Sequence, residues 1–404
     1  MIKKKILSFA TYPIANPQHG GQKRIDAIMS EYARAGIDAR FVAIYHDMFY
    51  NEAGPYDIAV RGKAFKEVLD SPFTGDVICG AAIFEDPEVK RLVIKTIREF
   101  KPDVIDIHQA FPFLGLEPLL KELNLDIPLI FNSHNIEYSM KEEMLEGLGW
   151  SSEDIDTVVS NIRTCEESLA KKASITVAVS TGDAKQLMAV GAKNAIVAPN
   201  GINRIKEREG EISYWRDTLA LDNIQKIALF VGSAHPPNWF GFKDMVGLGL
   251  GFLSQDERIV FAGSISEYVE NEVSKIKLNP GATTFWKRAY PAGRLSQEKL
   301  EGLICFADTI LLPITEGGGS NLKTAEAIIS GKKIVATDYA FRGFEKLKEL
   351  PNIYIANSQD EFVGTIQKVL SAKNIQRNEQ EMKLAETVLW HNCLRDFMER
   401  VKES

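Results

Sequence analysis

Hydrophobic positions recur along this chain in two forms, short unbroken apolar runs and longer segments with helical spacing. The apolar runs are typical of strands buried on both faces of a parallel sheet. Helical patterns between most of these runs predict repeated β–α units in two successive halves. The predicted strands are 5–11, 39–45, 104–108, 128–132, 175–179 and 195–198, then 227–231, 259–262, 283–286, 310–314, 334–337 and 353–356.

Four segments depart from this regular alternation. Residues 46–84 are aromatic-rich and are predicted to be irregular. Residues 204–223 are charged and are predicted to lie on the linker side of the domain boundary. A long helix is expected at 154–172, with Glu166 and Glu167 on a solvated face rather than forming a carboxylate pair. A single final helix is expected at about 378–401.

Residues 310–344 contain the most informative pattern. A buried strand is followed by Gly317, Gly318 and Gly319, then by Ser320 and Asn321 as helix N-cap candidates. A glycine loop at a helix N-terminus presents free N–H groups and the positive end of the helix dipole, which suit a phosphate. Lys323 lies in the first helical turn, where the dipole disfavours a cation unless an anion binds.

The order of residues in this stretch resembles the donor-binding element of GT-B glycosyltransferases, in particular the retaining GT4-like group. The resemblance implies that Glu326 binds the ribose of a nucleotide sugar and that the glycine loop and Lys323 bind its diphosphate. Many relatives have a glutamate where this chain has Gly318, and the nearest acid is Glu316. Either the loop is shifted by two residues, or the chain has a G-S-x-x-K-x-x-E loop, which fits 319–326 without a gap. The donor-binding residues implied in this way are Gly232, Ser233, Glu316, Gly318, Gly319, Ser320, Asn321, Leu322, Lys323 and Glu326.

Polar residues after the 128–132 strand form a second candidate site, which includes His134, Asn135 and Glu137. Strand-end loops are where open α/β sheets bind ligands. A lone histidine is more often structural, but this placement favours a functional role. The His-Asn-x-Glu order resembles the same family, which implies that His134 approaches the donor sugar and that His134 and Lys323 are the catalytic residues. Asn135 and Glu137 are then expected on the acceptor side.

Gly20 and Gly21, between the first strand and helix, resemble a loop beside the reaction centre of the same family. A tight turn with positive φ is at least as good an interpretation. The run Pro199-Asn200-Gly201-Ile202-Asn203 is a turn signal and resembles the interdomain crossing of GT4-like proteins. Gly232-Ser233 stands where many relatives have Gly-Arg, so Lys323 would supply the missing charge.

Composition narrows the function classes further. The net charge is −7 and there is no long basic tract, which argues against nucleic-acid binding. The four cysteines form no CxxC pair, which indicates no zinc site, and the resemblance implies a reaction that needs no metal. Neither a signal peptide nor a long apolar run appears, so a cytoplasmic protein is expected, with membrane contact at most peripheral.

We therefore expect an α/β protein of the GT-B class, with two doubly wound Rossmann-like domains facing a central cleft. The predicted domains are 1–200 on the acceptor side, 201–380 for the donor, and a C-terminal helix at 381–404 that crosses back to the N-terminal domain. The implied activity transfers a sugar from a nucleotide diphosphate sugar to the hydroxyl of a glycan, lipid-linked or small-molecule acceptor, with retention and without a cofactor. A nucleotide-sugar epimerase on this fold and a catalytically silent scaffold subunit are the alternatives.

Overall fold

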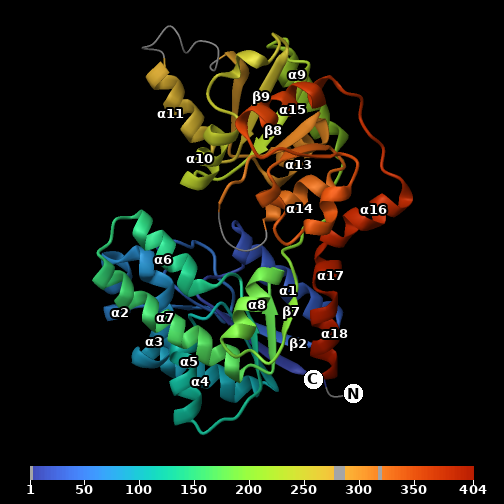
Figure 1. The fold of residues 1–404 in the computed structure, drawn as a ribbon. Coiled ribbons are helices and arrows are strands. Elements are labelled where there is room, and N and C mark those ends of the chain that lie inside the picture. The colour runs from blue at the N-terminus through green and yellow to red at the C-terminus, as the bar shows by residue number, and fades with distance from the viewer. Residues whose placement is uncertain (1–2, 277–286, 317–320) are drawn as a thin grey trace. The chain divides into compact units, whose positions relative to one another are not determined.

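The computed structural model describes residues 3–276, 287–316 and 321–404. Contacts divide the chain into a first unit, Met1–Asn200 with Cys393–Ser404, and a second unit, Gly201–Asn392 (Figure 1). Each unit is built around one parallel sheet. The predicted strand 283–286 lies outside the described residues.

The first unit has a seven-stranded sheet in the order β3-β2-β1-β4-β5-β6-β7. Its strands are β1 Lys5–Ala10, β2 Asp38–Tyr45, β3 Ile58–Ala59, β4 Val104–His108, β5 Leu129–Asn132, β6 Ile175–Ala178 and β7 Ala195–Val197. Its helices are α1 Gly20–Arg34, α2 Gly62–Asp70, α3 Gly75–Glu85, α4 Pro87–Phe100, α5 Phe113–Glu122, α6 Glu137–Gly147, α7 Ser152–Lys172, α8 Thr181–Ala189 and α18 Arg395–Glu403.

The second unit has a six-stranded sheet in the order β10-β9-β8-β11-β12-β13. Its strands are β8 Lys226–Val231, β9 Glu257–Ala262, β10 Ala289–Gly293, β11 Thr309–Leu312, β12 Lys333–Ala336 and β13 Ile353–Ile355. Its helices are α9 Glu209–Ala220, α10 Pro236–Met245, α11 Ser266–Ile276, α13 Gln297–Phe306, α14 Leu322–Ile329, α15 Gln359–Ser371, α16 Glu379–Ala385 and α17 Trp390–Cys393. Short 3-10 turns complete the two units at Pro72–Thr74, Leu250–Phe252, Asp338–Phe341, Glu345–Glu349 and Glu386–Val388.

Alternate strand residues face two different cores in the second unit. Ile227 and Leu229 of β8 pack with α9, α13 and α14, whereas Ala228 and Phe230 pack with α10 and α15. Both faces of the sheet are therefore covered by helices, which explains the unbroken apolar runs. The strand order reverses between β8 and β11, and in the first unit between β1 and β4. Ligands of open α/β sheets bind at the carboxyl ends of strands at this switch point.

Three predicted segments are wrong. Residues 46–84 are not irregular, since they form β3, α2 and α3. Helix α3 packs closely on α5, and a Cβ at Gly80 would lie 2.0 Å from the Phe111 carbonyl oxygen. A helix so tightly enclosed has no amphipathic stripe for a sequence pattern to reveal.

The charged segment 204–223 contains helix α9 rather than a linker. Trp215 and Leu219, four residues apart, are its buried positions, and Trp215 Nε1 donates to the Lys299 carbonyl at 2.8 Å. One short buried stripe is therefore enough to hold this helix.

The final segment is not one helix. Ile202 N donates to the Val388 carbonyl at 2.9 Å, and Trp390 N donates to the Ile202 carbonyl at 3.2 Å. This pairing takes up the backbone groups that a continuous helix would need. The part of this final segment that precedes Cys393 belongs to the second unit. Helix α18 belongs to the first unit, where it contacts β6 and β7. No helix of the described ranges is long and apolar enough to cross a bilayer.

Candidate active site

His134 follows β5 in the first unit, beside residues at the carboxyl ends of the switch-point strands β1 and β4. Its Nδ1 lies 3.2 Å from the hydroxyl oxygen of Tyr12, which comes shortly after β1. Its ring is 5.6 Å from that of His108, at the end of β4. The Nε2 atom is buried and has no hydrogen-bond partner among the described residues. One polar atom of a nearly buried ring is thus left for a ligand.

Burial sets the charge of this histidine. Desolvation, together with the nearby His108 and Arg24, holds the pKa of His134 well below its ordinary value. Desolvation and Glu137 raise the pKa of the Tyr12 phenol. Both side chains are therefore neutral at physiological pH, and the imidazole can take part in hydrogen bonds but does not supply a positive charge.

A buried carboxylate, Asp106, lies behind this histidine pair. It accepts hydrogen bonds from Tyr32 Oη at 2.9 Å, Asn132 Nδ2 at 2.6 Å and Ser8 Oγ at 3.3 Å, and His108 Nε2 lies 3.2 Å away. Burial alone would raise the pKa of Asp106, but His108 and these hydrogen bonds outweigh it and the pKa is lowered. The ionised carboxylate links β1, β4, β5 and α1 beneath the site.

Glu137 begins helix α6 and is fully buried. Its Oε1 accepts from Gln109 Nε2 at 3.3 Å, and burial and the nearby Glu166 raise its pKa well above the ordinary value. Asn135 lies just before it, and the Asn135 carbonyl accepts from Ser133 Oγ at 2.6 Å. The predicted residues of this loop are therefore held in place by local hydrogen bonds.

The prediction that Glu166 lies on a solvated face is wrong. Glu166 is buried, and its carboxylate accepts from Glu137 N at 3.1 Å and from Tyr138 N at 3.4 Å. It thereby satisfies free N–H groups at the start of α6. Burial raises its pKa to about 7. Glu167 is the solvated member of the pair, and its carboxylate bonds Arg163 Nε at 3.1 Å.

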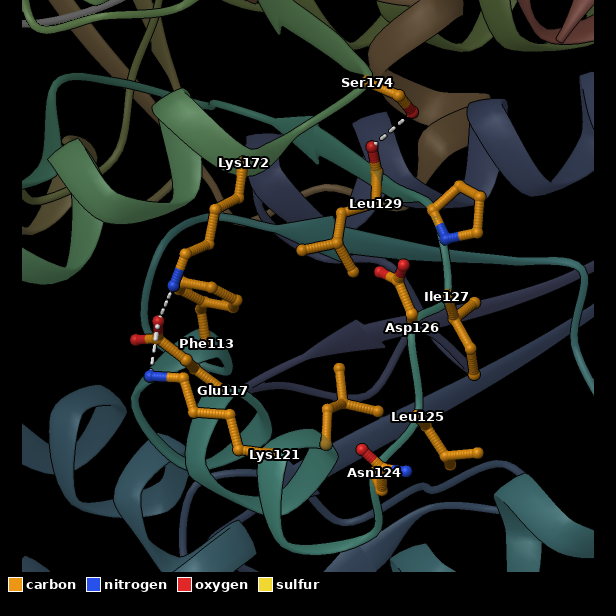
Figure 2. Close-up of a pocket in the computed structure, with 12 residues that line it drawn as sticks. Phe113, Glu117, Lys121, Asn124, Leu125, Asp126, Ile127, Leu129, Lys172 and Ser174 are labelled. Carbon is orange, nitrogen blue, oxygen red and sulfur yellow. Dashed lines mark hydrogen bonds and ion pairs between the residues drawn. The ribbon is translucent and has the colours of Figure 1, made fainter.

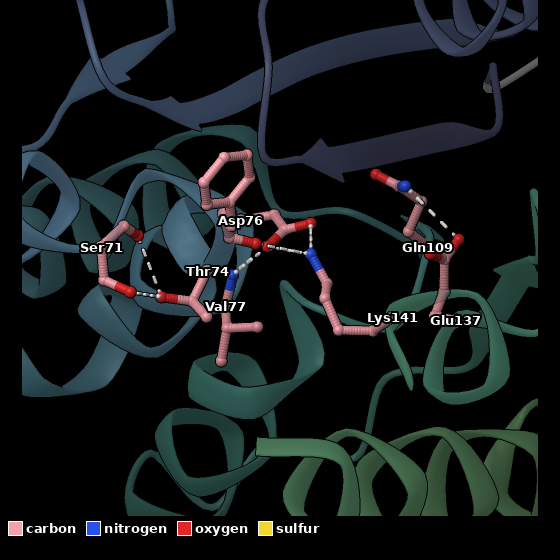
Figure 3. Close-up of polar contacts among 8 residues, drawn as sticks. Ser71, Thr74, Asp76, Val77, Gln109, Glu137 and Lys141 are labelled. Atoms are coloured by element: carbon pink, nitrogen blue, oxygen red, sulfur yellow. Dashed lines mark hydrogen bonds and ion pairs between the residues drawn. The ribbon is translucent and has the colours of Figure 1, made fainter. Parts of the chain in front are cut away.

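A cavity of about 440 Å³ lies next to these residues in the first unit. Asp76 and Lys141 form its charged part, with Lys141 Nζ 2.8 Å from Asp76 Oδ2 and 3.0 Å from the Phe73 carbonyl (Figure 3). Because the ion pair is internally compensated, the cavity offers a dipole and hydrogen-bonding groups without a large net charge. The aromatic and imidazole side chains of its wall are Tyr12, His19, His46, Phe49, Tyr50 and Phe73.

Gly20 and Gly21 form the first turn of α1 and not a loop. Neither glycine has positive φ, so the interpretation as a strained tight turn is wrong. Gly21 is required for space, because a Cβ there would lie 2.2 Å from the Tyr12 hydroxyl oxygen. The glycine therefore belongs to the environment of the Tyr12–His134 pair.

The second unit gathers its predicted residues around the start of α14. Asn321 caps this helix, its side chain accepting from Lys323 N at 3.0 Å. Lys323 Nζ donates to Asn238 Oδ1 at 2.5 Å, and Asn238 Nδ2 donates to Ser233 O at 3.0 Å and Ser233 Oγ at 3.1 Å. Asn238 thus links the segment after β8 to the helix after β11, across the switch point.

Lys323 is a half-buried cation with a neutral partner. Burial lowers the pKa of its ammonium group to about 8, while Glu326 acts in the opposite direction. No carboxylate of the described residues lies within ion-pair distance of Lys323 Nζ. A half-buried ammonium that is not paired with an acid is poised for an anion.

The other predicted donor residues surround Lys323. Glu316 and Asn321 line a cavity of about 150 Å³ together with His235 and Asn238. Lys323 and Glu326 line a second, much smaller pocket. Gly232 follows β8 and Leu322 is the first residue of α14. Gly318, Gly319 and Ser320 lie outside the described residues.

The largest cavity described, about 540 Å³, contains none of the predicted residues. It lies at the amino end of β5, where Glu117 of α5 pairs with Lys172 and, at 3.2 Å, with Lys121 (Figure 2). Ligands of parallel sheets bind at the opposite, carboxyl ends of the strands. We therefore place the functional site at the smaller cavities.

Sequence reasoning missed Tyr12, Asp106, Lys141 and Asn238. The available signal for Tyr12 was a polar aromatic directly after a strand and before two glycines. Gln109 has a left-handed backbone, with φ of 62°, at the end of β4. Such a conformation in a residue other than glycine often marks a functional loop, but it cannot be read from the sequence.

Comparisons with known proteins agree with this fold. Residues 20–204 match the family model of Glycosyltransferase Family 4. A search of curated protein sequences finds no match. The chain is similar to the crystal structure of HepE from Anabaena in complex with UDP, at 15% identity and a TM-score of 0.62, with 100% of each chain covered.

Two further solved structures show the same likeness. HepE in complex with UDP-glucose aligns at 16% identity and a TM-score of 0.61, covering 99% of this chain and 100% of HepE. Sucrose-phosphate synthase from Thermosynechococcus elongatus aligns at 14% identity and a TM-score of 0.69, covering 99% of both chains. Residues 20–204 thus match Glycosyltransferase Family 4 and the whole chain has the GT-B fold, which confirms the predicted resemblance to GT4-like GT-B glycosyltransferases.

Proposed function

We propose that this protein transfers a sugar from a nucleotide diphosphate sugar to an acceptor hydroxyl, with retention of configuration and without a metal. The second unit binds the donor through the glycine loop, Lys323 and Glu326. The first unit supplies His134 and the cavity that takes the acceptor. HepE was crystallised with UDP-glucose, which makes UDP-glucose the first donor to test.

Lys323 is the single observation that carries the proposal. Its ammonium lies in the first turn of α14 at the switch point of the second sheet and has an amide oxygen as its partner. A diphosphate would receive the helix N–H groups and this cation together. As a sugar leaves, negative charge grows on the diphosphate, and these fixed groups stabilise it.

The residues of the first unit favour positioning over side-chain base catalysis. His134 has a lowered pKa and Glu137 a raised one, and Glu137 is fully buried. In the proposed reaction the departing phosphate accepts the proton of the attacking hydroxyl, so the protein needs no separate base. His134 contributes a hydrogen bond to the sugar as the bond to phosphate breaks.

Ligand-dependent stability tests the donor assignment. Thermal denaturation is measured with UDP, GDP, ADP and UDP-glucose, and a bound ligand at 100 times its Kd adds about 2.7 kcal/mol to the free energy of unfolding. For the loss of Lys323, the matched control variant is Lys243→Ala, which removes an exposed lysine from α10, the helix that carries Asn238. No stabilisation by any of these ligands would contradict donor binding.

Product analysis tests the reaction itself. UDP-glucose is incubated with mono- and oligosaccharide acceptors, and the anomeric coupling of the new glycosidic bond is read by NMR. We expect acceptor-dependent UDP release and the α configuration of the donor in the product. Nucleotide release that is independent of any acceptor would favour the epimerase alternative, and binding without turnover would favour a silent scaffold.

A further inference from the structure

The direction of the hydrogen bond between Tyr12 and His134 determines which nitrogen of the imidazole carries the proton. The two residues are buried, and Tyr12 Oη lies 3.2 Å from His134 Nδ1. This hydrogen bond can run in either direction, from the phenol to a bare Nδ1 or from a protonated Nδ1 to the phenol oxygen.

Counting the remaining polar atoms separates the two directions. If Nδ1 carried the proton, the phenol O–H and the bare Nε2 would both be left unsatisfied, since neither has another partner among the described residues. If the phenol donates to Nδ1, the unsatisfied group is the Nε2–H alone. Unsatisfied buried groups are costly, so the second arrangement is favoured. It also agrees with the raised pKa of Tyr12 and the lowered pKa of His134, which keep both groups neutral.

Gly21 protects this contact. A Cβ at this position would lie 2.2 Å from Tyr12 Oη, 3.0 Å from Tyr12 Cζ and 3.4 Å from His19 Cε1. The overlap is therefore mainly with the hydroxyl, the same atom that bonds His134. Helix α1 has no need of glycine at this position for its backbone, since the φ of Gly21 is not positive.

We propose that Tyr12 is a positioning residue that holds His134 as the Nε2–H tautomer, and that Gly21 provides the space for the Tyr12 hydroxyl. His134 then presents a hydrogen-bond donor that accepts no proton, suited to an oxygen of a bound sugar or phosphate. The effect of this donor on turnover rests on the proposed function, whereas the tautomer itself does not.

The tautomer is measured by NMR of protein labelled with ¹⁵N in the histidine rings, with the His134 signals assigned from His134→Ala. We expect one protonated Nε2 and one bare Nδ1 in the wild type, and a mixture of tautomers in Tyr12→Phe. Tyr50→Phe, which removes a second hydroxyl from the same cavity, should leave the His134 tautomer unchanged. A protonated Nδ1 in the wild type would overturn the inference, as would an unaltered Nε2–H tautomer in Tyr12→Phe.

Turnover provides a second readout. Tyr12→Phe should lower kcat about tenfold while leaving the KM for the donor within about twofold, because a positioning defect acts on the reacting geometry. Gly21→Ala should cause a similar loss in the tyrosine background and little further loss in Tyr12→Phe, where the hydroxyl is gone. Losses that multiply in the double variant would refute the role of Gly21. A wild type that has the Nε2–H tautomer but transfers no sugar would refute the proposed function and leave the tautomer inference standing.

Discussion

At the residue scale, burial has different consequences for the two groups at the centre of the proposal. It lowers the pKa of both His134 and Lys323. The imidazole loses its charge at neutral pH because its ordinary pKa is already near 6.5. The Lys323 ammonium, with a pKa of about 8, stays mostly charged at pH 7. The first unit therefore offers a neutral hydrogen-bonding group and the second unit a cation, which suits the proposed diphosphate site in the second unit.

Lys323→Ala should weaken the binding of a nucleoside diphosphate by about 1.5–3 kcal/mol, the range for a charge-assisted hydrogen bond. Isothermal calorimetry measures the loss, with Lys243→Ala as the exposed control. Unchanged affinity in a folded variant would remove Lys323 from the site.

The pH dependence of nucleoside diphosphate binding reports on the protonation of Lys323. The pKa of Lys323 is lowered to about 8 in the free protein, and a bound diphosphate should raise it. Between the free and bound pKa values, binding then takes up a proton, so affinity falls as pH rises above about 8. Calorimetry in buffers of different ionisation enthalpy should detect this uptake in the wild type and not in Lys323→Ala. Equal proton uptake in both proteins would assign it to another group.

Glu326→Ala should weaken the binding of UDP more than the binding of inorganic pyrophosphate, because pyrophosphate has no ribose. Glu326 and Lys323 line one pocket, so both ligands should still be sensitive to Lys323→Ala. Competition calorimetry gives both affinities. Equal losses for the two ligands in Glu326→Ala would contradict ribose binding by this carboxylate.

At the element scale, helix α6 depends on a carboxylate from another helix. Glu166 of α7 caps α6, which begins at the buried Glu137 next to His134. Burial raises the pKa of Glu166 from 4.5 to about 7, and burial together with Glu166 raises the pKa of Glu137 well above its ordinary value. Since the folded protein then binds more protons than the unfolded chain, stability is highest at low pH in this window and falls as pH rises from about 4.5 to about 7.

Glu166→Gln should reduce this fall in stability, because the amide does not ionise. The thermal midpoint is measured from pH 5 to pH 7.5, and Glu167→Gln, at the exposed neighbour, is the matched control. A stability profile of Glu166→Gln that parallels the control at every pH would show that Glu166 titrates normally.

The elements that a sequence pattern predicted are those whose pattern is independent of distant partners. Strand β4 and helix α4 occur at the predicted residues, because one is a buried apolar run and the other an amphipathic helix with an N-cap at Asp86. Helix α3 and the break at Val388 were missed because close helix packing and a pairing to Ile202 decide them. Glu166 was misplaced for the same reason, since its partner is the start of another helix.

At the scale of the whole molecule, two doubly wound sheets followed from the sequence because each repeats a β–α pattern along the chain. The start of helix α14 with Asn321 as its cap also followed, since strand β11 and this helix are close in sequence. That these residues bind a sugar donor stays a prediction. The polar network of the first unit did not, because Tyr12, Asp106 and His134 come from β-α loops and strands far apart along the chain. Only the fold brings them together.

Because His134 and Lys323 belong to different units, binding and turnover should be separable. His134→Ala should leave the affinity for a nucleoside diphosphate within about twofold, since the proposed diphosphate site lies in the second unit. It should lower kcat about 10²-fold or more, the scale of losing one positioned polar group in the transition state. UDP is the ligand for the binding measurement, because UDP-glucose would mix the two effects. His391→Ala, at an exposed position, controls for loss of an imidazole. If turnover survives in His134→Ala, this histidine is a structural residue at the end of β5, and the active site of the first unit must be sought elsewhere.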